Sequence, residues 1–270
     1  MAGGVRRNGK PLRRPGLPVE SGWRLELEVD AARLAPRGDL APELTERDVV
    51  FMDEFLLALA KPPGLPCVPT ADPARPSLVR AAEGMLRARG QPDCLAVHQR
   101  LDRDTSGVVL FARHPRANAG LSAAFAERRV EKVYLVLTGR PSRPLPDHFE
   151  ADAPVHGKAA LTEFRVRARH PGGLLLEARP RTGRKHQIRI HLAQAGASVL
   201  GDARYGRAAT AARTMLHAWR LVLTHPVSGE RLRLECAVPR DFRTAAAALA
   251  RPARPSRRAR RGRPRAGGGR

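Results

Sequence analysis

Asp102 is the residue of this 270-residue chain whose surroundings best suit a reactive carboxylate. It lies in the stretch HQRLDRDTSG, residues 98–107, between Arg100 and Arg103. A carboxylate that acts as a nucleophile or general base must be ionised, must lie at a cleft and must be held by a rigid element. The Thr-Ser-Gly that follows predicts a tight turn into the apolar strand VVLFAR, which meets the last requirement. The alternative is an Asp that caps this turn, and the local sequence by itself favours that alternative.

A second stretch, RPRTGRKHQIRIHL at residues 179–192, concentrates positive charge around a Gly turn that runs into a helix. Such a cluster can hold phosphate groups through its side chains and the helix N-terminus. If Arg189 points toward Asp102, the ion pair would keep the carboxylate ionised. A basic helix face that binds RNA without catalysis would show the same pattern. His186 and His191 are five positions apart and do not share a helical face well, so they are not predicted to be a metal pair.

The chain is strongly basic, with 49 Lys and Arg residues against 26 Asp and Glu residues and a formal net charge of +23. This excess implies a polyanionic partner, and nucleic acid is the strongest candidate because binding releases the counterions of its phosphates. The last twenty residues hold nine arginines and no acidic residue, and we expect this tail to be disordered. The rest of the chain is still basic, so the tail would add to binding and not create it.

Tyr134 is one of two tyrosines in a chain whose aromatic content is 4%. In an RNA site its ring would offer a stacking platform for an unstacked base, worth about 1–3 kcal/mol per base. The alternative is a strand residue that packs in the core.

Signals for a metal, a nucleotide cofactor or a membrane are missing from the sequence. The three cysteines form no CxxC pair and have no His at zinc-ligand spacing, so neither a metal site nor a disulfide framework is predicted. There is no GxGxxG or Walker loop, so we expect no nucleotide cofactor. The N-terminus lacks the apolar core of a signal peptide, and no apolar run could span a membrane, which predicts a cytoplasmic protein.

Many strands and a few helices must position these side chains. Strands are predicted on both sides of a turn at Asp53-Glu54, and over residues 107–113, 130–139, 164–169 and 174–179, followed by a hairpin over 216–239 that turns at 226–229. Helices are predicted over 78–89, where Ser77 is the N-cap, over 115–128, and from 186 to a stop at Gly196. Without regular alternation of strand and helix, this order predicts an α+β fold with a mixed, mostly antiparallel central sheet and flanking helices.

We expect three regions along the chain. Residues 1–45 form a basic N-terminal arm with a turn at Asn8-Gly9 and a strand LELEV. This arm resembles the second half of a small RNA-binding module, truncated at its start, and a plain basic arm is an equally good interpretation. Residues 46–248 form the main domain, and residues 249–270 form the Arg-rich tail.

Taken together, five motifs in one order make the chain similar to the RluA-type pseudouridine synthases, from about Arg47 to Phe242. They are a lead-in strand pair ending in KPPGLP, then HQRLDRDTSG, then the Lys-x-Tyr strand EKVYLVLTG, then RTGRKHQIRIHL, and finally GDARYG with LHAWRLVLTHPVSGE. One such motif could be accidental, whereas five in order over some two hundred residues are specific. The resemblance implies a pseudouridine-synthase fold with a catalytic cleft and an RNA uridine isomerase that needs no cofactor.

The resemblance also implies roles for single residues. Asp102 matches the catalytic aspartate, Tyr134 the tyrosine that stacks on the target base, and Arg189 the basic residue paired with the aspartate. Arg100 matches the arginine that fills the gap left by the flipped nucleotide in close relatives. Further RNA contacts are predicted for Arg103, Arg184, Lys185 and His186. The substrate would be ribosomal or transfer RNA, and we expect a monomer.

One departure keeps other functions open. The family motif has His directly before Arg, whereas here Gln99 takes that place and His98 lies one residue earlier. A non-catalytic RNA-binding or ribosome-assembly protein on the same fold is therefore the main alternative, and a DNA-binding protein dominated by its basic tail is a more distant one. Neither alternative needs Asp102, Tyr134 and Arg189 together.

Overall fold

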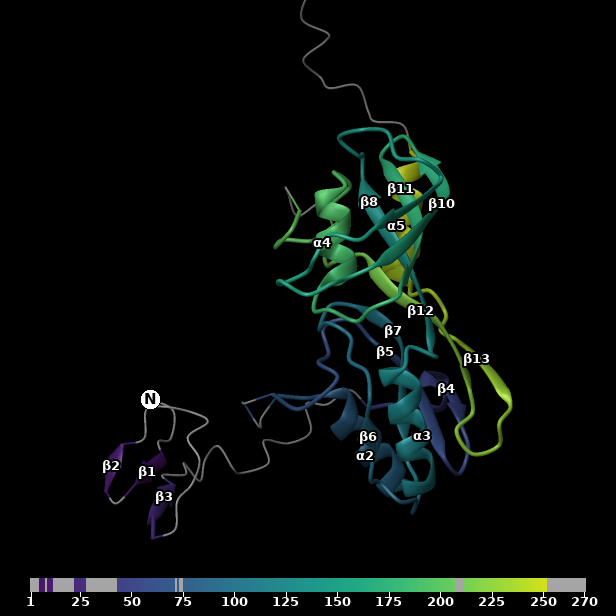
Figure 1. Ribbon diagram of the computed structural model, residues 1–270. Coiled ribbons are helices and arrows are strands. Elements are labelled where there is room, and N and C mark those ends of the chain that lie inside the picture. The colour runs from purple at the N-terminus through teal and green to yellow at the C-terminus, as the bar shows by residue number, and fades with distance from the viewer. Residues whose placement is uncertain are drawn as a thin grey trace, which may run out of the picture.

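The computed structural model describes residues 5–7, 9–11, 22–27, 43–70, 72, 75–206 and 211–251. Within these ranges the chain forms two sheets (Figure 1). The large sheet is flanked by helices, and the small sheet is separate from it. The small antiparallel sheet has the order β2 (Lys10–Pro11), β1 (Val5–Arg7), β3 (Leu25–Leu27), and β3 covers the start of the predicted strand LELEV. Asn8 of the predicted turn and residues 252–270 of the expected tail lie outside the described residues.

The large sheet has ten strands in a mixed, mostly antiparallel arrangement, as the sequence predicts. Its main path runs β4 (Val49–Met52), β5 (Leu56–Lys61), β7 (Ser106–Ala112), β12 (Leu216–Thr224), β8 (Glu131–Gly139), β11 (Gly173–Pro180), β10 (Thr162–His170), β9 (His148–Ala151). β6 (Ala96–Val97) pairs with β7, and β13 (Arg231–Glu235) pairs with β12 to form the predicted hairpin. Among the described strand pairs, only β7 and β12 run parallel.

Helices cover both faces of this sheet. They are α2 (Leu78–Ala88), α3 (Pro115–Ala126), α4 (Gln187–Gln194) and α5 (Arg240–Ala250), while a short 3₁₀ turn, η1 (Glu46–Asp48), precedes β4 and buries no residue. Ser77 caps α2 as predicted, because its side chain accepts a hydrogen bond from the backbone N–H of Arg80. The sequence analysis did not predict β6, β9 or α5, and α5 extends two residues beyond the boundary expected at residue 248.

Alternate residues of β5 pack into different hydrophobic clusters on the two faces of the sheet. In β5, Leu57 and Leu59 pack toward α2, whereas Leu56 and Ala58 pack toward α3. β5 is therefore a continuous apolar run, as expected for a strand buried on both faces. The other half of the sheet is arranged in the same way, since α4 packs on one face of β8 and β11 and α5 packs on the other (Figure 1).

The two halves meet where β7 lies beside β12. Ser106 pairs with His217, and Gly107 pairs with Ala218. Gly107 has a φ of +125°, and a Cβ built on it would lie 2.2 Å from the backbone oxygen of Ala218. The glycine of the Thr-Ser-Gly motif is thus required by the close approach of two strands, and the tight turn precedes it, with the N–H of Thr105 bonded to the C=O of Asp102 at 3.1 Å.

Candidate active site

A cavity of about 300 Å³ opens beside the junction of the two half-sheets. Three chain segments contribute to its wall: the turn before β7, the residues leading into α4, and Thr214 just before β12. Its lining residues are Asp102, Arg103, Asp104, Thr105, Lys185, His186, Arg189 and Thr214. Two sequence motifs that are more than eighty positions apart therefore share one cavity.

Asp102 and Arg189 form an ion pair inside this cavity. The Arg189 Nη1 donates to Asp102 Oδ2 at 3.0 Å. The side chain of Asp102 is 29% exposed and that of Arg189 is 11% exposed, so the carboxylate faces the cavity while the guanidinium is largely covered. The sequence analysis made the ion pair conditional on Arg189 pointing toward Asp102, and the structure shows that orientation.

Asp202 is a second carboxylate that is hydrogen-bonded to Arg189, and the sequence analysis did not select it. Arg189 Nε and Nη2 donate to Asp202 Oδ2 and Oδ1 at 2.7 and 2.8 Å, and the backbone N–H groups of Arg204 and Tyr205 also donate to Oδ1. Burial opposes ionisation of Asp202, but these hydrogen bonds outweigh it and hold its pKa below the usual value. The GDARYG motif was the available signal, because it contains both Asp202 and Tyr205.

His186 lies in the cavity beside Asp102, with its Nε2 3.6 Å from Asp102 Oδ1. Its Nδ1 is 3.0 Å from the hydroxyl of Tyr205, and its backbone is left-handed with a φ of 59°. Burial lowers the pKa of His186, although the charge of Asp102 opposes this shift. The neutral imidazole is therefore the main form near pH 7.

Tyr134 occupies the middle of β8, where it pairs with Ala178 of β11 and Ala218 of β12. Its ring is partly buried and packs against the core clusters on both sides of the sheet junction, and it is not among the residues that line the cavity. Burial, and next the charge of Asp102, raise the pKa of its phenol, which keeps the hydroxyl neutral. The ring thus packs in the core, close enough to Asp102 for the two groups to interact.

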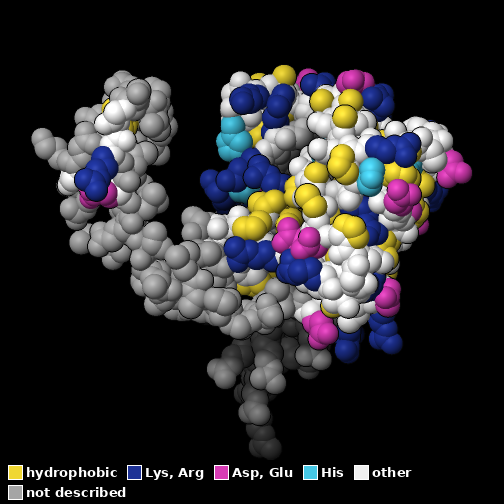
Figure 2. Space-filling view, turned by 90° about the horizontal axis from the view of Figure 1, so that it is seen from below, with side chains coloured by type: hydrophobic (Ala, Val, Ile, Leu, Met, Phe, Trp, Pro, Cys, Tyr) yellow, Lys and Arg dark blue, Asp and Glu magenta, His cyan; other side chains and the backbone are white. Residues whose placement is uncertain are grey.

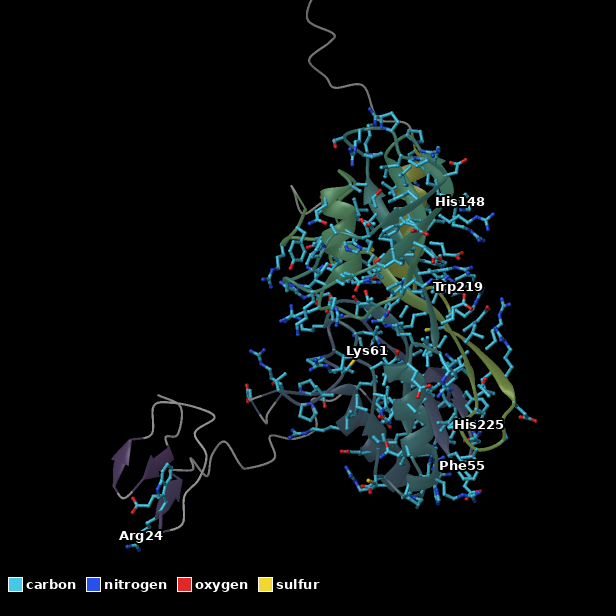
Figure 3. All side chains as sticks on the ribbon, viewed as in Figure 1. Arg24, Phe55, Lys61, His148, Trp219 and His225 are labelled. Carbon is cyan, nitrogen blue, oxygen red and sulfur yellow. The ribbon has the colours of Figure 1, made fainter. Side chains whose placement is uncertain are left out.

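Lys61 is a buried lysine that the sequence analysis did not select, and Figure 3 labels it in the middle of the molecule. Its Nζ donates to the carbonyls of Pro62 and Leu65 at 2.8 Å and to that of Arg103 at 2.9 Å. Burial lowers the pKa of Lys61 to about 8. The last residue of β5 therefore ties the KPPG turn to the residue that follows Asp102.

Arg213 also contacts the turn that contains Asp102. Its Nη1 donates to the carbonyl of Asp104 at 3.1 Å and its Nη2 to the hydroxyl of Ser106 at 3.3 Å. The guanidinium also holds the carboxylate of Asp241, at the start of α5, through Nε and Nη2 at 2.6 and 3.1 Å. Since α5 was not predicted, this link between the C-terminal helix and the Asp102 turn could not be foreseen.

Of the predicted RNA-binding residues, Arg103, Lys185 and His186 line the cavity, whereas Arg100 and Arg184 are not among its lining residues. Arg100, Arg103 and Lys185 are exposed, and Arg184 is partly exposed, with its Nε donating to the carbonyl of Ala159 at 3.1 Å. Figure 2 shows Lys and Arg side chains along the left edge of the large body, beside other side chains of mixed type. Exposed cations near an ion-paired carboxylate suit a polyanionic substrate.

His98 and Gln99, where the sequence departs from the family motif, do not line the cavity. The ring of His98 stacks on that of Phe125 in α3 with centroids 6.3 Å apart, and its Nε2 is buried without a hydrogen-bond partner among the described residues. Gln99 Nε2 approaches the carbonyl of Val108 at 3.5 Å. Neither residue lines the cavity, so the departure leaves the Asp102 and Arg189 contact intact.

Two other searches cover only the part of the chain that the structure describes. No group of three or more His, Cys, Asp or Glu side chains there could hold a metal ion. No helix in those ranges is both long and apolar enough to cross a membrane.

Comparisons with known proteins give a consistent result. Residues 56–194 match the family model described as RNA pseudouridylate synthase. The chain is 33% identical to ribosomal large subunit pseudouridine synthase D of Zymomonas mobilis subsp. mobilis, covering 87% of this chain and 82% of that protein. It is 32% identical to ribosomal large subunit pseudouridine synthase C of Escherichia coli O6:H1, over 92% and 85% of the two chains. Its fold is similar to that of human RNA pseudouridylate synthase domain containing 4, with a TM-score of 0.64 at 23% identity, over 75% of this chain and 93% of that one.

Proposed function

The chain belongs to the RNA pseudouridylate synthase family, and we propose that it isomerises uridine in large-subunit ribosomal RNA with Asp102 as the reactive carboxylate. The RluA-type resemblance of its motifs is confirmed by these relatives, and so is an isomerase acting on RNA. The choice of large-subunit RNA over transfer RNA is supported by the names of relatives that align with most of the chain. The observation that carries the role of Asp102 is its ion pair with Arg189 inside the cavity.

The reaction makes clear demands on the site. The bond between uracil N1 and the ribose anomeric carbon breaks, a bond from C5 to that carbon forms, C5 loses a proton and N1 gains one. The target nucleotide must first leave its stack, at a cost of a few kcal/mol. In the proposal, contacts from Arg100 and the cations around the cavity to the RNA offset that cost.

Asp102 would act once the nucleotide has entered the cavity. It would attack the anomeric carbon as a nucleophile or remove a sugar proton as a base, and both steps require the ionised carboxylate. Arg189 supports ionisation, and the partial exposure of Asp102 leaves its carboxylate open to the substrate. Tyr134 is proposed to supply a ring surface for the base, as the family resemblance implies. We also propose that the protein acts as a monomer in the cytoplasm without a cofactor.

The test is a pseudouridine map of total RNA from cells with and without the gene, complemented by wild-type protein or by Asp102→Ala. The expected result is a large-subunit ribosomal site that is lost on deletion and restored by wild type alone. A site restored equally by Asp102→Ala would refute the role of Asp102. No change at any site would favour the non-catalytic RNA-binding protein, and a changed site in transfer RNA would correct the substrate.

A further inference from the structure

Arg189 is shared unequally between two carboxylates. Asp202 receives two of its nitrogens, Nε and Nη2, at 2.7 and 2.8 Å, in the bidentate geometry that a guanidinium favours. Asp102 receives only Nη1, at 3.0 Å. The guanidinium plane is therefore set by Asp202, and the contact with Asp102 follows from it.

The two carboxylates also differ in how fully they are occupied. Asp202 is completely buried, and two backbone N–H groups hold it in addition to Arg189. Asp102 is partly exposed, and within the described part of the chain the recorded ion-pair partner of its Oδ1 is His186, at 3.6 Å. Asp202 thus has the bonding pattern of a fixed support, whereas Asp102 keeps one oxygen available to the cavity.

Charge sharing follows from this geometry. One positive charge faces two carboxylates, so the group of Asp102, Arg189 and Asp202 carries a net negative charge when all three are ionised. Two unit charges about 4 Å apart interact by about 4 kcal/mol at the effective dielectric near a protein surface. If Arg189 were not shared, both oxygens of Asp102 would be free to pair with it, and the carboxylate would be less available for reaction.

We propose that Asp202 is a positioning residue for the isomerisation: it orients Arg189 and shares its charge, so that Asp102 is held by a single hydrogen bond with one oxygen free. This inference rests on the proposed function, because it assumes that Asp102 reacts. Asp202 acts through Arg189 and does not touch the substrate.

The first variant is Asp202→Asn, which keeps the size of the side chain and an oxygen for the two backbone N–H groups. Its amide nitrogen faces a donor of Arg189, so the guanidinium is released toward Asp102. We expect kcat to fall about 10- to 100-fold, as for other residues that orient a reactive group, while KM for RNA changes less than about 3-fold. Loss of one negative charge near Asp102 also moves the acidic limb of the kcat profile to lower pH.

Other titratable and charged groups lie around Asp102. The shift of the acidic limb can be assigned to the loss of Asp202 only if these groups are unchanged in the variant. They come from its own turn, from the end of β5 and the segment after it, from β8, and from the start of α4 and the residues before it: Arg103, Asp104, Lys61, Cys67, Tyr134, Lys185 and His186. None of them is altered in Asp202→Asn. A matched control is Asp147→Asn, which breaks an exposed ion pair with Arg169 on a distant part of the sheet and is expected to leave the profile unchanged.

The second test is a double-mutant cycle with Arg189→Met. Arg189→Met alone moves the acidic limb to higher pH, opposite to Asp202→Asn, because it removes the cation. If Asp202 acts only through Arg189, the double variant Arg189→Met/Asp202→Asn has nearly the same kcat as Arg189→Met. The double variant also leaves no unpaired buried charge, so it remains informative if Asp202→Asn does not fold.

Two results would overturn the proposal. One is folded Asp202→Asn protein whose acidic limb does not move or whose loss lies in KM. The other is a double variant whose kcat is at least about 10-fold below that of Arg189→Met. The failure of the proposed function is distinct from both, because it appears as undiminished turnover by Asp102→Asn.

Discussion

The carboxylate of Asp102 and the guanidinium of Arg189 are hydrogen-bonded at 3.0 Å although 87 positions separate them in the chain. Asp102 lies in the turn before β7 and Arg189 in the first turn of α4, so the contact exists only because the two half-sheets join at β7 and β12. An aspartate that capped its own turn would not need this distant partner. The observed pair therefore supports the proposed role of Asp102.

Asp102→Asn should abolish turnover and spare RNA binding. The amide cannot act as a nucleophile or base, while the basic surface that binds phosphates is unchanged. Single-turnover release of tritium from RNA labelled at uridine C5, together with a binding titration, measures both quantities. Asp93→Asn, which breaks an exposed ion pair with Arg87, is the control and should retain activity. Turnover by Asp102→Asn near the wild-type rate would contradict the assignment.

Two variants of Tyr134 separate its ring from its hydroxyl. Tyr134→Phe keeps the ring and should retain most binding of the flipped base, whereas Tyr134→Ala should lose about 1–3 kcal/mol of it. Because the ring also packs in the core, Tyr134→Ala should lower the free energy of unfolding by about 3–5 kcal/mol. Binding of RNA to folded protein and urea unfolding distinguish these effects. Equal losses in both variants would show that the hydroxyl, and not the ring, matters.

Lys61 should make stability depend on pH in a definite direction. Burial lowers its pKa from 10.5 to about 8, so between these values the unfolded state holds a proton that the folded state has released. The free energy of unfolding therefore rises with pH in that window, as the cost of burying the ammonium is removed. Relative to Lys61→Met, the wild type should gain about 2–3 kcal/mol between about pH 7 and about pH 10.

Urea unfolding of both proteins at the two pH values measures this change for Lys61. The comparison cancels the titration of the tyrosines and of the cysteines other than Cys67, whose thiol interacts with Lys61. A difference between wild type and Lys61→Met that stays constant with pH would contradict the lowered pKa.

Gly107→Ala should destabilise the fold by at least about 3 kcal/mol. The added Cβ would meet the backbone oxygen of Ala218 at 2.2 Å, and the φ of +125° disfavours any residue except glycine. The matched control is Gly84→Ala in the middle of α2, where a Cβ meets nothing within 4 Å. That variant should stabilise the protein by about 0.5–1 kcal/mol. Thermal unfolding of both variants tests the contrast, and similar effects would refute it.

Removal of the last twenty residues should lower the affinity for RNA and make that affinity less dependent on salt concentration. That segment holds nine arginines. If all of them contact phosphates, the magnitude of the slope of log K against log salt should fall by about 6. If only some of them do, the slope changes less, and the size of the change gives the number of phosphate contacts. Turnover at saturating RNA should be unchanged. A loss of kcat would show that the tail contributes to the reaction itself.

Local sequence patterns predicted many of the strands and helices. Alternation and apolar runs predicted β5, β7, β8, β10, β11 and the β12–β13 hairpin, and Ser77 and Gly196 marked helix ends, because these patterns depend on neighbours a few residues apart. The motif around Asp102, the Arg189 stretch and Tyr134 were selected from residue types and their order, and their roles stay predictions. The helix α5 was missed although its buried residues, Phe242 and Leu249, are seven positions apart and therefore lie on one helical face.

Tertiary structure alone decided how those residues are held. Asp202, Lys61 and Arg213 are charged residues whose partners lie on other elements, and a buried charge becomes recognisable as a support only when its partners are known. The close approach of Gly107 to Ala218, and the position of Tyr134 in the core beside the cavity, also depend on strands far apart in the chain. The sequence by itself determined the family and the candidate site residues, because both depend on residue types and their order; the long-range packing of the two half-sheets decided that Asp102 and Arg189 meet, because the two residues lie 87 positions apart.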